Sequence, residues 1–212
     1  MTDSCVEIAA SPNSVATRAD IEAVLRLHGE PVRLVGWNLS EAALKGIDFN
    51  SCEFVRCRAA RANFSSCDLT DARFVSCDLN NTNWTRAILS AAVFTDCKLT
   101  GMQIVDARTL GLEFERCLLV SAQLRGLSFR RSELEEIDFE GADLTEADFR
   151  EATLTRCSLR DANVTNARFE GADLRGCDLG NLHLADASRF KGAIISKQQA
   201  AGLLSSLGLK VV

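Results

Sequence analysis

Apolar side chains recur every five residues along most of the chain, a spacing that fits neither a helix nor an ordinary strand. The pattern is clearest in residues 132–151, SELEE IDFEG ADLTE ADFRE, where Leu or Phe stands at the centre of each block of five. A small or aliphatic residue stands two places before each centre, and the other three places are polar or glycine. From Val32 to about Asp186 this register holds for 31 consecutive blocks, and 26 of their centres are Leu or Phe. The chain is therefore an internal repeat.

The repeat predicts a coil in which each block of five forms one side. Two residues of each block are expected to point inward, one large and one small, and the other three outward. A chain that turns a corner after every block closes a four-sided coil in four blocks, and successive coils can stack at the strand spacing of about 4.8 Å. Columns of Leu and Phe would then fill the core, with small residues at the corners. We therefore expect an all-β solenoid over residues 32–191.

A short helix is predicted before the repeat. Residues 1–16 show no periodicity and are expected to form a flexible tail. Residues 17–31 are expected to cap the first coil with a helix over 18–28, because Thr17 and Asp20 resemble a capping box. The residues on one face of this helix are Ile21, Val24, Leu25 and His28.

A second helix is predicted after the repeat, in residues 192–212. The five-residue register slips at Asp186, and Phe190 follows Leu184 by six positions instead of five. The helix is expected to begin at Ser196 and to stop at Gly208. Its apolar face contains Ala200, Leu203, Leu204 and Leu207.

The repeat motif resembles that of a known family. Blocks such as ADLTE, ANFSS, CDLTD, ADLRG and CDLGN resemble the pentapeptide repeat, over about 155 of the 212 residues. This resemblance implies a right-handed quadrilateral parallel β-helix. The C-terminal segment QQAAGLLSSLGLKVV is similar to that of the Qnr-type quinolone-resistance proteins. The repeats of this chain contain no looped insertions, and in this respect the chain resembles the MfpA branch more closely.

The resemblance to the Qnr and MfpA subgroup also implies partners. It suggests DNA gyrase or topoisomerase IV as the partner, which the protein would protect from quinolone-type inhibitors. It also suggests a homodimer joined by the C-terminal helix. The candidate dimer residues are Leu203, Leu204, Leu207, Leu209 and Val211.

Cysteine is concentrated at the small inward position of the repeat. Eight of the nine cysteines occupy it, and six of these are separated by whole multiples of four blocks, which places them in one column: Cys57, Cys77, Cys97, Cys117, Cys157 and Cys177. A metal or redox site is one interpretation. A column of buried thiols in a reducing compartment is the favoured one, because a column does not converge on a point and neither His28 nor His183 is placed to join a site. We expect no metal and no cofactor.

No catalytic motif occurs in the sequence, which predicts a protein that is not an enzyme. Aspartates recur just before the block centres and are interpreted as turn residues. The composition, 47% hydrophobic and 25% charged, is typical of a soluble protein, and no segment predicts a signal peptide or a membrane span, so we expect a cytoplasmic location. A net charge of −5 argues against direct binding of nucleic acid.

Negative charge is concentrated in residues 132–151, which hold nine acidic residues and only Arg150 as a base. As a partner-binding surface, this coil offers Glu133, Glu135, Glu136, Asp138, Glu140, Asp143, Glu146, Asp148 and Glu151. The alternative is a solvated surface with ion pairs between residues one coil apart, such as Arg116 with Asp96, Arg156 with Glu136, Arg131 with Glu151, and Arg160 with Glu140.

A second candidate surface is apolar. Val105, Leu110, Leu118 and Val120 stand at outward places of the repeat, close to Thr109, which replaces a Leu or Phe centre. Three hypotheses follow from the sequence. The favoured one is a topoisomerase-binding protein, the second is a scaffold for an unknown protein partner that uses the acidic or apolar surface, and the third, much weaker, is an enzyme that acts through a cysteine.

Overall fold

The structure, a computed structural model, describes residues 6–9, 15–29, 31–180, 187–206 and 208–210. It divides into two compact units, Met1–Leu118 and Leu119–Val212, hereafter the first unit and the second unit. The first unit contains β1 (Val6–Ala9), α1 (Arg18–His28), β2 (Val32–Val35), β3 (Glu53–Val55), β4 (Arg73–Val75), β5 (Val93–Thr95) and β6 (Glu113–Glu115). The second contains β7 (Glu133–Glu135), β8 (Thr153–Ser158), β9 (Asp173–Asp178), the 3-10 helix η1 (Ala187–Phe190) and α2 (Lys197–Ser206).

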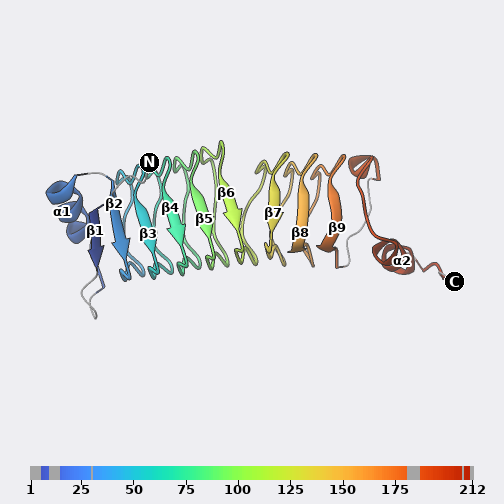
Figure 1. Cartoon of the computed structure of the whole chain (residues 1–212), viewed down its shortest axis with the longest axis horizontal. Helices are drawn as coiled ribbons and strands as arrows, with labels where there is room; N and C mark the ends of the chain where they lie inside the picture. The colour runs from blue at the N-terminus through green and yellow to red at the C-terminus, as the bar shows by residue number, and fades with distance from the viewer. Residues whose placement is uncertain (1–5, 10–14, 30, 181–186, 207, 211–212) are drawn as a thin grey trace. The chain divides into compact units, whose positions relative to one another are not determined.

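Successive coils pair in parallel, so that each residue lies beside its counterpart in the next coil. Strands β1 to β6 form one parallel sheet and β7 to β9 another, each in chain order, as the arrows in Figure 1 show. Phe54 of β3 pairs with Leu34 of β2 and with Phe74 of β4. The other three sides of the coil carry single parallel bridges with the same shift of four blocks, such as Ala43 to Asn63. The fold is the predicted parallel β-solenoid, with a short helix at each end of the chain.

Most corners of the coil depend on a left-handed residue. The backbone takes a positive φ two places after the block centre, and this position is most often occupied by a residue other than glycine, such as Arg61 with φ 60°. The amide of Ala42 donates to the carbonyl oxygen of Leu39 at 3.0 Å, which closes a β-turn around the left-handed Glu41. Aspartates before the centres act in the predicted way, since Oδ1 of Asp143 accepts a hydrogen bond from the amide of Thr145 at 3.0 Å.

The inward columns pack as stacked rings. In the first unit, Phe54, Phe74 and Phe94 stack with ring centroids 4.5 and 4.7 Å apart, and Phe64 stacks on Trp84 at 4.4 Å. Rings from different sides of the coil meet edge to face, as Trp84 does with Phe94. In the second unit the stack contains Phe129, Phe149, Phe169 and Phe190. The four-block period of the coil therefore places like side chains in van der Waals contact.

The N-terminal helix begins and ends as predicted, but the expected tail contains a strand. Thr17 and Asp20 form the capping box of α1, Ile21 is buried, and His28 is exposed rather than packed. Val6–Ala9 pair with β2 as strand β1, which corrects the prediction of a flexible tail over that stretch. The indole nitrogen of Trp37 donates to the carbonyl oxygen of Ile8 at 2.9 Å. The open edge of β2 thus finds a partner for its backbone groups.

The solenoid continues past the slip in the sequence register. Phe190 stacks on Phe169 with centroids 4.9 Å apart, and Asp173 bridges to Ile194, so this coil contains a single extra residue. The predicted end of the solenoid at residue 191 is therefore corrected to about residue 194. Helix α2 follows, with Ser196 and Gln199 as its capping box. The side-chain Nε2 of Gln199 also donates to the carbonyl oxygens of Leu174 and Cys177, both at 2.7 Å, and so joins α2 to the last coil.

Candidate functional site

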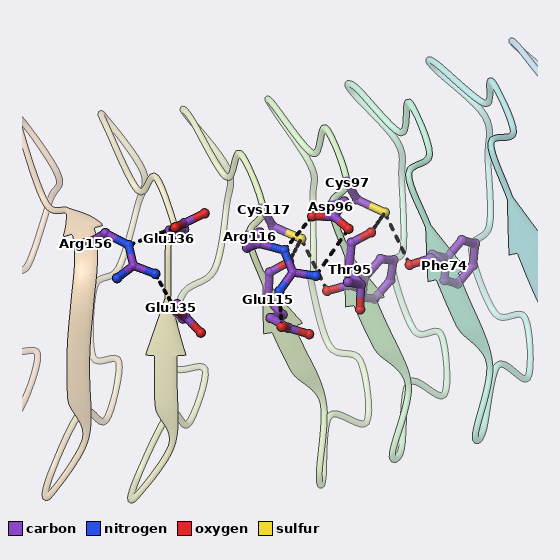
Figure 2. Close-up of polar contacts among 11 residues, drawn as sticks. Phe74, Thr95, Asp96, Cys97, Glu115, Arg116, Cys117, Glu135, Glu136 and Arg156 are labelled. Atoms are coloured by element: carbon purple, nitrogen blue, oxygen red, sulfur yellow. Dashed lines mark hydrogen bonds and ion pairs between the residues drawn. The ribbon is translucent and has the colours of Figure 1, made fainter.

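The cysteine column has a structural role. All eight cysteines among the described residues are free and buried. The thiol of Cys97 donates to the carbonyl oxygen of Phe74 in the preceding coil, with Sγ 3.4 Å from that oxygen, as Figure 2 shows. The same contact recurs between Cys157 and Leu134 at 3.4 Å. Six thiols therefore donate to a backbone carbonyl oxygen of the preceding coil, those of Cys57, Cys67, Cys77, Cys97, Cys117 and Cys157.

Burial holds the thiols of Cys67, Cys157 and Cys177 in the neutral form. Burial raises the pKa of Cys67 and of Cys157 to about 11, and burial also raises the pKa of Cys177. A thiol is a nucleophile or metal ligand only as the thiolate, so these groups are poorly suited to either role. Among the described residues, no three His, Cys, Asp or Glu side chains are grouped to hold a metal ion. No helix among them is long and apolar enough to cross a membrane.

The acidic coil 132–151 lies in the second unit, with strand β7 on its first side. Five of its nine acidic residues form ion pairs: Glu135 and Glu136 with Arg156, Glu146 with Arg125, Asp148 with Arg150, and Glu151 with Arg130 and Arg131. Asp138 and Asp143 accept hydrogen bonds from backbone amides two residues ahead. Glu133 and Glu140 are exposed and, among the described residues, form no ion pair and no side-chain hydrogen bond.

Three of the four predicted ion pairs between residues one coil apart are present, and one is not. Arg116 pairs with Asp96, with Nε 2.6 Å from Oδ1, and Arg156 pairs with Glu136 at 2.8 Å, both drawn in Figure 2. Arg131 pairs with Glu151 at 2.8 Å. The predicted pair of Arg160 with Glu140 is wrong, because Arg160 binds Asp178 at 2.9 Å instead. These pairs lower the pKa of Asp96 and of Glu151.

The four sides of the coils in the second unit differ in net charge. The first side (132–136, 152–156, 172–176) and the second side (137–141, 157–161, 177–180) are hereafter the acidic sides. They hold eight acidic residues and three arginines, a net charge of −5. The third side (122–126, 142–146, 162–166) has a net charge of −1. The fourth side (127–131, 147–151, 167–171, 188–192), hereafter the basic side, holds six cations and three acidic residues.

The basic side was missed by reasoning from the acidic coil alone. That coil carries acidic residues on all four sides, and its neighbours decide the balance on each one. The signal was present in the sequence, because positions four blocks apart share a side and can be summed as columns.

The predicted apolar residues are largely exposed. Leu110 is 85% exposed, and Val105 and Leu118 are exposed by about two-fifths. All three belong to the first unit, whereas Val120 belongs to the second and is half-buried. Thr109 is half-buried at a centre where the other coils bury Leu or Phe.

The predicted dimer residues lie at and beyond α2. Leu203 is half-buried, and Leu204 and Leu209 are 40% and 55% exposed, while Leu207 and Val211 lie outside the described residues. An open cleft of about 410 Å³ lies between α2 and the last coil and is lined by Arg175, Ser196, Leu203 and neighbouring residues.

A family model described as pentapeptide repeat region matches residues 32–104 and 111–188. The chain belongs to this family. Two solved structures of QnrB1, described as a plasmid-mediated fluoroquinolone resistance protein, are similar to it. The trypsin-treated M102R form has 20% sequence identity and a TM-score of 0.71, over 98% of each chain. The full-length form has 21% identity and a TM-score of 0.68, over 84% of this chain and 91% of that one. No curated protein matched the sequence.

The two matched segments leave out residues 105–110, which contain Val105 and Leu110. Leu110, the most exposed leucine among the described residues, therefore lies in the segment where the family pattern is interrupted.

Proposed function

We propose that this pentapeptide-repeat protein is a non-catalytic, protein-binding solenoid that binds a type II topoisomerase, DNA gyrase or topoisomerase IV, and protects it from quinolone-type inhibitors. The observation that carries the proposal is the likeness of its fold to QnrB1, a fluoroquinolone resistance protein, over 98% of both chains. The burial of all eight described thiols, with the pKa of Cys67 and of Cys157 raised, supports a role in binding rather than catalysis.

The acidic sides of the second unit are the surface that we assign to the topoisomerase. An enzyme that binds duplex DNA presents cations to it, and a surface with the charge density of a duplex can compete for those cations. Three stacked coils span about 14 Å, and a duplex of that length carries about 8 charges, of which about half face one way. The net charge of −5 on the acidic sides is of this size. This similarity to the charge of a duplex is confined to the second unit, because residues 32–118 of the first unit hold ten basic and ten acidic residues.

The test is a supercoiling assay with purified gyrase and ciprofloxacin. We expect the protein to restore supercoiling at micromolar concentration or below. The double variant Glu133→Lys with Glu140→Lys should lose the protection, because it reverses two exposed acidic-side carboxylates that form no ion pair and no side-chain hydrogen bond among the described residues. Neither substitution breaks an ion pair, so the fold should persist.

The matched control reverses the same charge in the first unit. Asp71→Lys with Glu113→Lys changes two exposed carboxylates that also form no ion pair among the described residues. This variant should protect gyrase as well as the original protein does. Absence of both protection and gyrase binding by the unmodified protein would refute the proposed function, and equal loss in both variants would refute the assignment to the acidic sides.

A scaffold for another protein is the second candidate, and the exposure of Leu110 favours it. An 85% exposed leucine in the segment that the family pattern omits is an unusual surface feature. If a partner binds there, Leu110→Ser should weaken its binding without lowering the stability of the protein. If Leu110→Ser instead abolishes gyrase protection, the topoisomerase itself uses this segment.

We also propose a homodimer through α2 and the residues after it. Leu204 and Leu209 leave apolar surface exposed at the end of the second unit. Sedimentation of the whole chain should give a dimer, and a chain ending at Ser196 should give a monomer. A dimer that survives this truncation would contradict the proposal.

A further inference from the structure

The basic side of the second unit collects cations that the net charge of the chain conceals. Its cations are Arg130, Arg131, Arg150, Arg168, Arg189 and Lys191. The parallel bridges Ser128 to Asp148 and Asp148 to Arg168 show that these blocks lie on one side of consecutive coils. With three acidic residues on the same side, the net charge is +3.

The three acidic residues of the basic side leave cations in excess. Glu151 is shared by Arg130 at 3.1 Å and Arg131 at 2.8 Å, and Arg150 pairs with Asp148 at 2.5 Å. Lys191 is exposed and forms no ion pair among the described residues. The pairs of Arg130 and Arg131 with Glu151, and of Arg168 with Glu170, are more exposed than that of Arg150 and exchange more easily with external anions, so these three arginines remain available to a partner.

The chemistry of the other outward positions decides which anionic partner fits. Apart from the inward Phe of each block, residues 128–131, 148–151, 168–171 and 189–192 are charged, glycine or serine. Stable anchoring to a membrane and a tight protein interface both use apolar or aromatic side chains in addition to charge, and this side does not offer them. A phosphate backbone requires only cations in rows on a rigid support, and arginine binds phosphate through two parallel hydrogen bonds.

We propose that the basic side of the second unit binds the phosphate backbone of duplex DNA without sequence preference. The stacked coils present a new row of cations about every 4.8 Å along a rigid surface. This inference rests on the arrangement of the cations and stands independently of the proposed topoisomerase partner.

The net charge of −5 does not prevent this contact. The second side, which carries a net charge of −3, lies across the packed core from the basic side. The charges of the second side are therefore about 10 Å farther from a phosphate at the basic side than the arginines are, and each contributes less to the electrostatic energy of that phosphate. A phosphate at the basic side is therefore governed by the nearby arginines. The sequence-based expectation of no nucleic-acid binding used the total charge, and the arrangement of the charges leads to the opposite expectation.

The test measures fluorescence anisotropy of a labelled 20-base-pair duplex with the full chain at several KCl concentrations. With about three phosphates neutralised, the affinity should fall about 40-fold between 50 and 200 mM salt. Arg130→Gln with Lys191→Gln should lower the affinity at least tenfold at 50 mM and reduce the salt slope by about 2. Glu151 keeps its partner Arg131 in this variant, so the fold is retained.

The matched control is Arg125→Gln with Arg175→Gln, which removes the same charge from the third and first sides of the same unit. This control should keep its affinity for the duplex within about twofold. No duplex binding at 50 mM salt, or an equal loss in both variants, would overturn the proposal. Phosphatidylserine vesicles serve as a second probe, and binding to them as tight as to the duplex would overturn the assignment to nucleic acid. Gyrase protection is a separate readout, so failure of either proposal can be recognised.

Discussion

The two units of the solenoid share one set of inward residues and differ in what they present to solvent. In residues 32–118 the ten basic and ten acidic residues balance, whereas the coils of the second unit carry −5 on their acidic sides and +3 on the basic side. The inward places repeat Leu, Phe and small residues in both units. The fold therefore constrains two residues in five, and the remaining three are free to specialise. Function is to be sought in those outward columns.

The cores of the two units place their aromatic rings on different sides of the coil. On the third side, the inward residues Phe64 and Trp84 of the first unit stack as aromatic rings, whereas the second unit has Leu144 and a half-buried Val164. Trp84 also meets Phe74 and Phe94 edge to face. The first unit thus stacks aromatic rings on its first and third sides, whereas the second unit stacks them on its fourth side and has aliphatic residues on those two sides.

The largest expected effect tests this difference in the core. Trp84→Ala should lower the free energy of unfolding by about 4 kcal/mol and Leu144→Ala by about 3 kcal/mol, because both side chains are fully buried and the indole loses three ring contacts. Urea denaturation measures both losses. Hydrogen exchange should accelerate mainly in the mutated unit, since a repeat coil contacts only its neighbours. Equal acceleration in both units would show that they unfold as one cooperative body.

An intermediate effect concerns pH, and here the two units should behave alike. The folded-state pKa of Cys67 in the first unit and of Cys157 in the second is about 11, raised by burial from 9.0. A raised pKa gives a stability contribution that is complete below about pH 9, where the unfolded thiol ionises, and is lost as the pH rises to about 11. Each thiol should account for about 2–3 kcal/mol of this loss.

Cys67→Ala and Cys157→Ala should each flatten the pH dependence of unfolding between pH 9 and 11. The comparison is made by slopes, because each variant also loses a thiol hydrogen bond at every pH. An unchanged slope in either variant would show that its thiol is accessible in the folded protein, and native-state labelling with a thiol reagent provides an independent check.

The smallest effect concerns the ion pairs at the corners. Arg116→Ala removes the partner of Asp96 and Glu115 in the balanced first unit, and Arg156→Ala removes the partner of Glu135 and Glu136 on the acidic sides. Both losses of stability should be small because the groups are exposed. The loss should be greater for Arg156→Ala at low salt, since it leaves adjacent glutamates unpaired, and should vanish at 1 M salt. A salt-independent loss would point to packing of the arginine stem instead.

Most of the fold followed from the sequence because its signals are local and repeated. The five-residue period predicted the coil and its parallel stacking, and Thr17 with Asp20 marked the start of α1. Strand β1 could not be predicted in this way. Val6–Ala9 are four residues without a turn signal, and they become a strand because β2 would otherwise leave its backbone edge unpaired.

The sequence by itself determined which residues point inward, where the helices begin, and that the charges lie outside. The tertiary structure decided which of those charges meet. Arg160 pairs with Asp178 instead of Glu140, because side chains from different coils compete for partners across the stack. The tertiary structure also decided that the solenoid continues beyond the register slip. Phe190 stacks on Phe169 although one extra residue lies between their blocks, because the ring contact stabilises this arrangement. The five-residue period tells which side of the coil each residue occupies, whereas the packing of side chains between stacked coils decides which charged residues pair.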